Sequence, residues 1–287
     1  MEDFDKLWNY SDTAATEIKF KEALADSGDK NLSYKLQLQT QIARTNSLRA
    51  LFAEAHEILD AVEKQLPDSA DLSAVRYHLE RGRTFNSAGN KAEALKHFEA
   101  AKKMSEILGE DFYLLDALHM IAIAVPPLEA IKVNQKALIL AEESKNERAQ
   151  NWLGSLYNNL GWEYFDLGEY EKALSIFLRA LQWRETRQNA REIFIAKWCV
   201  ARTLRALNRN DDALTIQLAL FEESTTTGHE DGYVHEELGE LFLLKNDALK
   251  YPFHFEKAYN HLSTEVFLQR NEQPRLERIK KLAGLNS

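Results

Sequence analysis

The sequence has a single cysteine, Cys199, and it lacks any run of roughly 18 apolar residues that could cross a membrane as a helix. One cysteine excludes a disulfide within the chain and is typical of a reducing compartment. The first residues, MEDFDKLWNYSD, are acidic and contain no apolar core of a secretory signal. From these absences we expect a cytoplasmic protein without a membrane-spanning segment.

Glycine and proline are scarce, with 11 and 5 among 287 residues. Together with 45% hydrophobic and 28% charged residues, this is the composition of a soluble helical protein. The formal net charge is -9. An acidic chain is a poor general binder of nucleic acid, because contacts with phosphates need clustered Lys and Arg.

Motifs for catalysis and for cofactor or metal binding are missing as well. There is no glycine-rich phosphate loop and no G-x-S-x-G segment, and VHEELGE lacks the second histidine of a zinc-binding H-E-x-x-H motif. No pair of cysteines is present for zinc, and Cys199 lies in an apolar stretch, as buried structural thiols do. We therefore expect no catalytic residues, no metal and no cofactor, and a protein that is not an enzyme.

A set of small and aromatic residues recurs along the chain. In LGWEYFDLGEYEKALSIFLRAL, Gly161 is followed at offsets 3, 7, 12, 16 and 19 by Tyr164, Gly168, Ala173, Phe177 and Ala180. The same offsets from Gly82 give Phe85, Gly89, Ala94, Phe98 and Ala101. More degenerate copies start from Ala43, Ala201 and Gly239, and residues between 82 and 161 leave room for one further copy. Six repeats of 38 to 40 residues indicate a solenoid or array.

The residue sizes in the repeat indicate a pair of packed helices. Small residues at the anchor and at offsets 12 and 19 allow two helices to approach closely, and a Gly or Asn at offset 7 ends the first helix. We expect six helix pairs over residues 31–262. Residues 1–30 are predicted to form an N-terminal cap or a degenerate repeat, and residues 263–287 a C-terminal capping helix, because the apolar ends of a solenoid need cover.

The segment LGWEYFDLGEYEKALSIFLRAL resembles the tetratricopeptide repeat (TPR) family, and the resemblance extends over about 31–262. The period exceeds the usual roughly 34 residues, which suggests longer helices, as in kinesin light chains. The resemblance implies an all-α fold in which antiparallel helix pairs form a right-handed α-solenoid, or superhelix. We expect residues 1–287 to form one such domain.

In the resembled family the first helix of each pair lines a concave groove that binds a partner. Transferred by position relative to the anchor, the candidate groove residues are Asn158, Asn159, Trp162, Trp198, Arg202, Arg205, Arg44 and Arg83. Tryptophan and arginine are the most frequent binding hot spots, and arginine binds carboxylates through two parallel hydrogen bonds. We expect Trp162 and Trp198, with Arg202 and Arg205, to form the centre of the site.

These residues predict a protein-interaction module that binds a peptide or a partner segment in its concave groove. The alternative is a regulatory sensor whose solenoid encloses a small anionic ligand. Two structural interpretations also remain open: Trp162 and Trp198 as core residues, and the arginines as partners of Glu80 or Glu163 along the groove wall. The asparagine at the position of Asn159 does not recur in the other repeats, which disfavours the binding of a long extended peptide.

Overall fold

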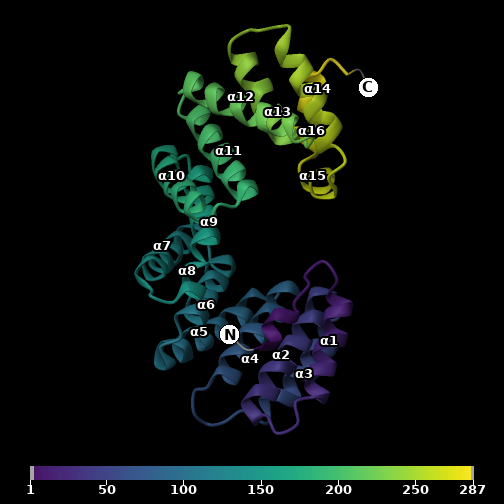
Figure 1. Cartoon of the computed structure of the whole chain (residues 1–287), viewed down its shortest axis with the longest axis vertical. Helices are drawn as coiled ribbons and strands as arrows, with labels where there is room; N and C mark the ends of the chain where they lie inside the picture. Colours follow the sequence, from purple (N-terminus) through teal and green to yellow (C-terminus); the bar gives the residue numbers. More distant parts are fainter. Residues whose placement is uncertain (1–2, 286–287) are drawn as a thin grey trace. The chain divides into compact units, whose positions relative to one another are not determined.

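The structure, a computed structural model, describes residues 3–285, and none of these residues lies in a strand (Figure 1). The all-α solenoid fold of antiparallel helix pairs expected from the sequence is confirmed. The chain divides into two compact units, Met1–Leu156 (unit 1) and Tyr157–Ser287 (unit 2). That the whole chain forms one domain remains a prediction. No helix within residues 3–285 has the length and apolar character needed to span a membrane.

Unit 1 begins with a short 3-10 helix and continues with helices joined by short turns. Its elements are η1 (Asp3–Leu7), α1 (Thr13–Ala25), α2 (Leu32–Leu48), α3 (Phe52–Glu63), α4 (Leu72–Ser87), α5 (Lys91–Leu108), α6 (Asp111–Ala124), α7 (Pro127–Glu143) and α8 (Glu147–Gln150). Each helix from α1 to α7 packs against the next, and α4 also packs against α2 and α6. The first helices of successive pairs therefore lie side by side, as a solenoid requires.

Unit 2 repeats this arrangement with a different ending. Its elements are most of α9 (Leu153–Asp166), α10 (Tyr170–Arg187), α11 (Ala190–Ala206), α12 (Asn210–Thr226), α13 (Gly232–Leu244), α14 (Lys250–Leu262), α15 (Val266–Asn271) and α16 (Gln273–Leu282). Helix α16 packs on α14 and buries Leu276 and Ile279 against Phe255 and Leu262. The six expected pairs are α2–α3, α4–α5, α6–α7, α9–α10, α11–α12 and α13–α14, whereas the short helices α8 and α15 were not expected.

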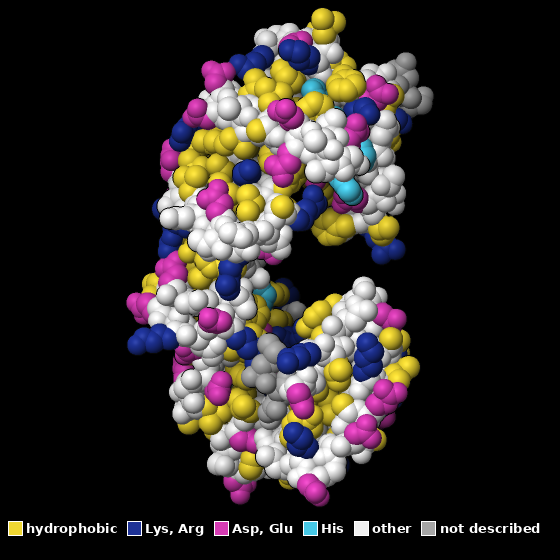
Figure 2. All heavy atoms as spheres, in the orientation of Figure 1, with side chains coloured by type: hydrophobic (Ala, Val, Ile, Leu, Met, Phe, Trp, Pro, Cys, Tyr) yellow, Lys and Arg dark blue, Asp and Glu magenta, His cyan; other side chains and the backbone are white. Residues whose placement is uncertain are grey.

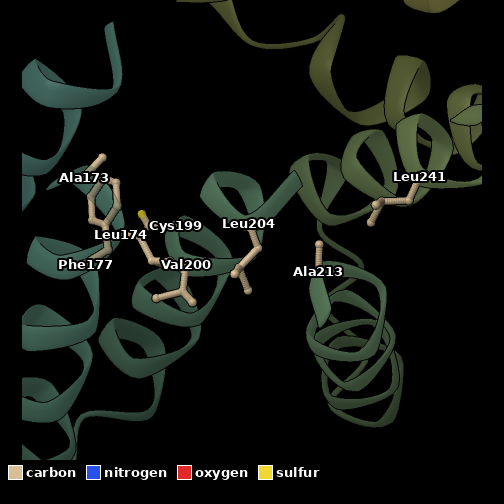
Figure 3. Packing of buried hydrophobic residues seen from close by; sticks show 8 residues of the cluster. All are labelled: Ala173, Leu174, Phe177, Cys199, Val200, Leu204, Ala213 and Leu241. Carbon is tan, nitrogen blue, oxygen red and sulfur yellow. The ribbon is translucent and has the colours of Figure 1, made fainter. Parts of the chain in front are cut away.

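Phenylalanines at offset 16 of the repeat explain the anchor glycines. A Cβ atom on Gly161 would lie 2.7 Å from the ring atom Cζ of Phe177, and one on Gly82 would lie 2.6 Å from Cδ1 of Phe98. Distances this short do not occur between packed carbon atoms, so only glycine fits. Phe177 in turn belongs to a cluster that α10 and α11 share with α12 and α13 (Figure 3).

The residues at offset 7 end the first helix of several pairs. Gly89 and Gly168 have φ angles of 85° and 75°, and Asn208 and Asn246 have φ angles of 60° and 54°. This left-handed conformation is favourable for glycine and tolerated by asparagine. The turn prediction made from the repeat is therefore confirmed at these four positions.

Substitution of the anchor glycine tests this packing. We expect Gly161→Leu to lower the free energy of unfolding by about 1–3 kcal/mol, because the new side chain must displace the Phe177 ring from a filled contact. Urea denaturation of both proteins measures the difference. Asp166→Leu, which adds the same side chain at the exposed end of α9, should change the free energy by less than about 0.5 kcal/mol. Equal stabilities for wild type and Gly161→Leu would contradict the close contact.

Candidate functional site

Three aromatic side chains from successive first helices form a row in unit 2. Trp162 of α9 lies 6.0 Å from Trp198 of α11, and Trp198 lies 5.9 Å from Tyr233 of α13, measured between ring centroids. All three side chains are partly exposed, although both tryptophans also pack against the core cluster that contains Phe177. We call Trp162, Trp198 and Tyr233 the aromatic face of unit 2. Each of the two tryptophans therefore packs partly in the core and is partly exposed at the surface, so both interpretations apply to it.

The predicted arginines lie beside this face. The guanidinium of Arg202 is 5.8 Å from the ring centroid of Trp198 and 5.4 Å from that of Phe165. Glu237 of α13, only 1% exposed, accepts a hydrogen bond from Arg202 and two from Arg205, whose Nε and Nη2 atoms are 2.7 and 2.8 Å from its oxygens. Arg202 and Arg205 therefore pair with a buried carboxylate, that of Glu237, which the pairing interpretation had not named.

This group of three ionised side chains keeps its charges. Burial would raise the pKa of Glu237, but the hydrogen bonds and charges of Arg205 and Arg202 lower it below its usual value. Burial likewise opposes the charge of Arg205, and the hydrogen bonds with Glu237 raise its pKa nevertheless. Two arginines on one carboxylate leave a net charge of +1 next to the aromatic face.

The two predicted asparagines lie one helical turn before Trp162. Asn158 and Asn159 are on α9, and both are partly exposed. Unit 2 thus brings Trp162 and Trp198 together with Arg202 and Arg205. That these residues and the two amides bind a ligand remains a prediction.

The acidic side chains of α13 near this face are neutralised by the capping helix. Arg275 of α16 donates from Nε to Glu236 over 2.8 Å, and Arg278 donates from Nη2 to Glu240 over 3.0 Å. Sequence reasoning missed both arginines because α16 lies outside the repeat register. Only the packing of α16 on α14 places Arg275 and Arg278 beside the carboxylates of α13.

The other two predicted arginines, Arg44 and Arg83, belong to unit 1, where they line a pocket of about 370 Å³. Its aromatic lining consists of Trp8, Tyr10, Phe112, Tyr113 and Trp152. Its charged lining consists of the arginines Arg44, Arg76, Arg83 and Arg148 and the carboxylates Asp5, Glu80 and Asp116. Four positive and three negative charges give the lining a net charge of +1. We call this cavity the unit 1 pocket.

Arg44 and Arg83 share the buried carboxylate of Glu80. Nη1 of Arg44 donates to both oxygens of Glu80 over 3.1 and 3.2 Å, and Nη1 of Arg83 donates over 2.7 Å. Arg83 also pairs with Asp116. Burial opposes the charge of Arg83, but Asp116 and Glu80 hold its pKa above the usual range. For Arg44 and Arg83, the structure thus has the pairing with Glu80 that was one of the two open interpretations of the arginines.

Several residues of the unit 1 pocket were not predicted as site residues. Arg76 lies six positions before Gly82 on α4, a position that the repeat register places on the inward face, although Arg76 was not among the candidate site residues. Asp5 and Arg148 lie outside the six helix pairs, on η1 and α8. No pattern in the sequence relates these two residues to the pocket.

Two features of the described residues concern metal binding and the reactivity of Cys199. Within residues 3–285 no group of three or more His, Cys, Asp or Glu side chains is placed to hold a metal ion. Cys199 is 3% exposed, and burial raises the pKa of its thiol to about 12. Such a thiol stays protonated at neutral pH and is a structural side chain rather than a nucleophile.

Comparison with known proteins relates one segment of the chain to a repeat family. Residues 154–187 match the sequence profile of the tetratricopeptide repeat. No curated protein sequence matches the chain significantly.

Three solved structures are similar in fold. The apo form of RapI has a TM-score of 0.76 at 13% identity and covers 98% of this chain and 80% of its own. A Signal Transduction ATPase with Numerous Domains from Pyrococcus horikoshii, which has a tetratricopeptide repeat sensor, has a TM-score of 0.73 at 17% identity; the match covers 93% of this chain and 41% of that chain. The apo quorum sensor NprR from B. thuringiensis has a TM-score of 0.51 at 14% identity and covers 95% and 83%.

Identities this low establish the fold alone. The repeat matched in sequence contains Gly161, Gly168 and Phe177, the residues whose packing and turn geometry recur in the other helix pairs. Residues 154–187 therefore have the sequence pattern of the tetratricopeptide repeat, and the chain has a helical solenoid fold similar to that of the three solved structures.

Proposed function

We propose that this chain is a non-catalytic protein-interaction module that binds a peptide or a partner segment on the aromatic face of unit 2. The observation that carries the proposal is the row of partly exposed rings of Trp162, Trp198 and Tyr233, with the guanidinium of Arg202 over Trp198. Aromatic and arginine side chains on adjacent helices are the composition of a binding hot spot. Asn158 and Asn159 add amides that can hydrogen-bond a peptide backbone.

Two details of the face favour a ligand. Arg202 keeps 26% of its side chain exposed while it pairs with Glu237, so its charge remains accessible. The indole Nε1 of Trp198 is buried and has no hydrogen-bond acceptor within the described part of the chain. An acceptor supplied by a ligand would remove the cost of that unsatisfied donor.

The proposed partner is a protein or peptide rather than nucleic acid, and we place the protein in the cytoplasm. Figure 2 shows Lys and Arg side chains interspersed with Asp and Glu side chains over the visible face of each unit, without a continuous basic patch. The single cysteine is consistent with a reducing compartment. Two proteins of similar fold are described as a quorum sensor and as containing a repeat sensor, and both descriptions fit a module that recognises a ligand.

A second candidate function is a sensor that encloses a small anionic ligand. The unit 1 pocket favours it, because four arginines face three carboxylates in a cavity lined by aromatic rings. A volume of about 370 Å³ is within the range of small-molecule sites.

The first proposal is tested with a peptide selected from a random library by binding to the full chain. We expect Trp198→Ala and Arg202→Ala each to weaken its affinity by roughly 30-fold, which corresponds to about 2 kcal/mol for a hot-spot residue. Arg191→Ala removes an exposed arginine elsewhere on α11 and should leave the affinity within about twofold. Circular dichroism verifies the fold of each variant. If both Trp198→Ala and Arg202→Ala bind as wild type does, the aromatic face is not the binding surface.

A further inference from the structure

Residues of the N-terminal segment form part of the unit 1 pocket. The carboxylate of Asp5, on η1, accepts two hydrogen bonds from Nη2 of Arg76, over 2.8 and 2.7 Å, and one from Nη2 of Arg148, over 3.3 Å. These two arginines are 71 and 143 residues away along the chain. Arg76 is 4% exposed and also donates from Nε to the hydroxyl oxygen of Tyr113 over 2.9 Å. Arg76 and Arg148 therefore form a preformed binding site for a carboxylate in this pocket.

Asp5 is tethered to unit 1 by its neighbours. Phe4 is 2% exposed, and its ring centroid lies 5.1 Å from that of Tyr34. Nε1 of Trp8 donates to Gln41 over 3.1 Å, and the hydroxyl of Tyr34 donates to Asp3 over 2.8 Å. None of these contacts needs the carboxylate of Asp5. The segment can consequently stay attached when that carboxylate leaves its two arginines.

The charged side chains of the unit 1 pocket favour the binding of an anion. Arg44 and Arg83 already have Glu80, and Arg83 also has Asp116. Asp5 is the one carboxylate of the pocket lining that pairs with Arg76 and Arg148. With Asp5 in place the lining has a net charge of +1, and with Asp5 displaced it has a net charge of +2. The pocket therefore favours an anion in either state, and the carboxylate of Asp5 on Arg76 and Arg148 shows that a carboxylate fits these two arginines.

The remainder of the lining favours an aromatic group beside that carboxylate. The guanidinium of Arg148 lies 3.5 Å from the ring centroid of Phe112, and the rings of Trp8 and Tyr10 are stacked 4.7 Å apart. Nε1 of Trp152 and Nε of Arg44 are buried donors without an acceptor among residues 3–285. A planar ring can stack on such aromatic and guanidinium groups, and an oxygen atom next to it can accept hydrogen bonds from the donors.

We propose that the unit 1 pocket binds an aromatic carboxylate, free or as the C-terminal residue of a peptide, and that Asp5 is a built-in competitor which the ligand carboxylate displaces from Arg76 and Arg148. The inference rests on the second candidate function above and is independent of the aromatic face of unit 2. Displacement of Asp5 converts ligand binding into the loss of the hydrogen bonds that hold its carboxylate on Arg76 and Arg148, while Phe4 keeps the segment on unit 1. The contacts of the N-terminal segment thereby depend on whether a ligand occupies the pocket.

Calorimetric titration of the full chain with N-acetyl-L-tryptophan tests the competition. Asp5→Asn removes the competing charge, and we expect it to tighten binding by about tenfold or more, because the apparent affinity falls with the fraction of molecules whose site is free. Asp3→Asn is the matched control. It makes the same change of charge on the same short helix, outside the pocket lining, and should leave the affinity within about twofold. N-acetyl-L-tryptophanamide, which has no carboxylate, should bind neither protein.

Amide hydrogen exchange provides a second readout in the unaltered protein, even if Asp5→Asn fails to fold. Saturating N-acetyl-L-tryptophan should speed exchange at residues 5–10, and unchanged exchange with the probe bound would overturn the displacement. Equal affinity of wild type and Asp5→Asn overturns the competition but leaves the pocket as a ligand site. If neither protein binds the probe or the tetrapeptide Ala-Ala-Ala-Trp, the proposed ligand class is wrong, whereas the second candidate function falls only if the pocket binds no small anion. Tighter binding of the tetrapeptide identifies a peptide as the source, and equal binding identifies a free acid.

Discussion

Glu237→Ala is expected to lower the free energy of unfolding by about 3–5 kcal/mol, the typical cost of removing one partner from a buried ion pair. The carboxylate is 1% exposed and accepts hydrogen bonds from both Arg202 and Arg205. Its loss leaves two partly exposed guanidinium groups, those of Arg202 and Arg205, next to each other without the carboxylate that pairs with both. The cavity left by the side chain adds to this cost.

Urea denaturation of the full chain, followed by circular dichroism, measures the effect. Glu237→Gln keeps an oxygen that can accept hydrogen bonds but removes the charge, so we expect an intermediate loss. Glu256→Ala, at an exposed position on α14, is the control and should change the free energy by less than about 0.5 kcal/mol. A loss below about 1 kcal/mol for Glu237→Ala would show that Arg202 and Arg205 do not depend on this carboxylate.

Acidification is expected to destabilise unit 2 through a buried pair of histidines. Nδ1 of His235 lies 3.0 Å from Nδ1 of His254, and the two side chains are 1% and 6% exposed. The pKa of each histidine is lowered to about 4, and burial is the largest cause. For His235, Glu230 opposes this shift and Lys257 adds to it. For His254, the neighbouring His235 and Lys250 add to it. The folded protein therefore keeps both rings neutral at a pH where the unfolded chain, with a pKa of about 6.5, binds protons.

The sign of the pH dependence follows from this difference. Stability is fully present above about pH 6.5, falls as the pH decreases toward about 4, and levels off below that, where the folded protein is protonated too. Each histidine contributes at most about 1.4 kcal/mol per pH unit in this range. Urea midpoints between pH 7 and pH 4.5 measure the slope, and His254→Leu should reduce it. The exposed His229→Gln is the control, and a slope unaffected by His254→Leu would contradict the assignment.

The second pair of this kind occupies the same register of another repeat. His78 and His97 stand at the same offsets from Gly82 as His235 and His254 from Gly239, and their Nδ1 atoms are 2.9 Å apart. Burial and the charge of His97 lower the pKa of His78 to about 4. The repeat therefore places the same histidine contact in both units, buried in unit 2 and partly buried in unit 1.

The repeat pattern by itself determined contacts within a helix pair, although it did not predict the short helices α8 and α15. Gly161 and Phe177 are 16 residues apart, on the two helices of one pair, so a fixed spacing is enough to bring them into contact. The glycine or asparagine at offset 7 acts within its own turn. The same register placed Trp162 and Trp198 on neighbouring first helices, and the structure has them side by side. Such contacts recur with the period, and a periodic signal can be read from one sequence.

The tertiary structure alone decided the charge partners of the candidate sites. Asp5 reaches Arg148 across 143 residues, and Arg275 reaches Glu236 from the capping helix. The carboxylates that hold the predicted arginines lie on the next first helix, as Glu237 does for Arg205. A long flexible side chain can reach several oxygens, and the repeat register does not distinguish between them. Which pair forms depends on how closely the helices approach and which carboxylate is buried there, and these follow from the packing of the whole unit.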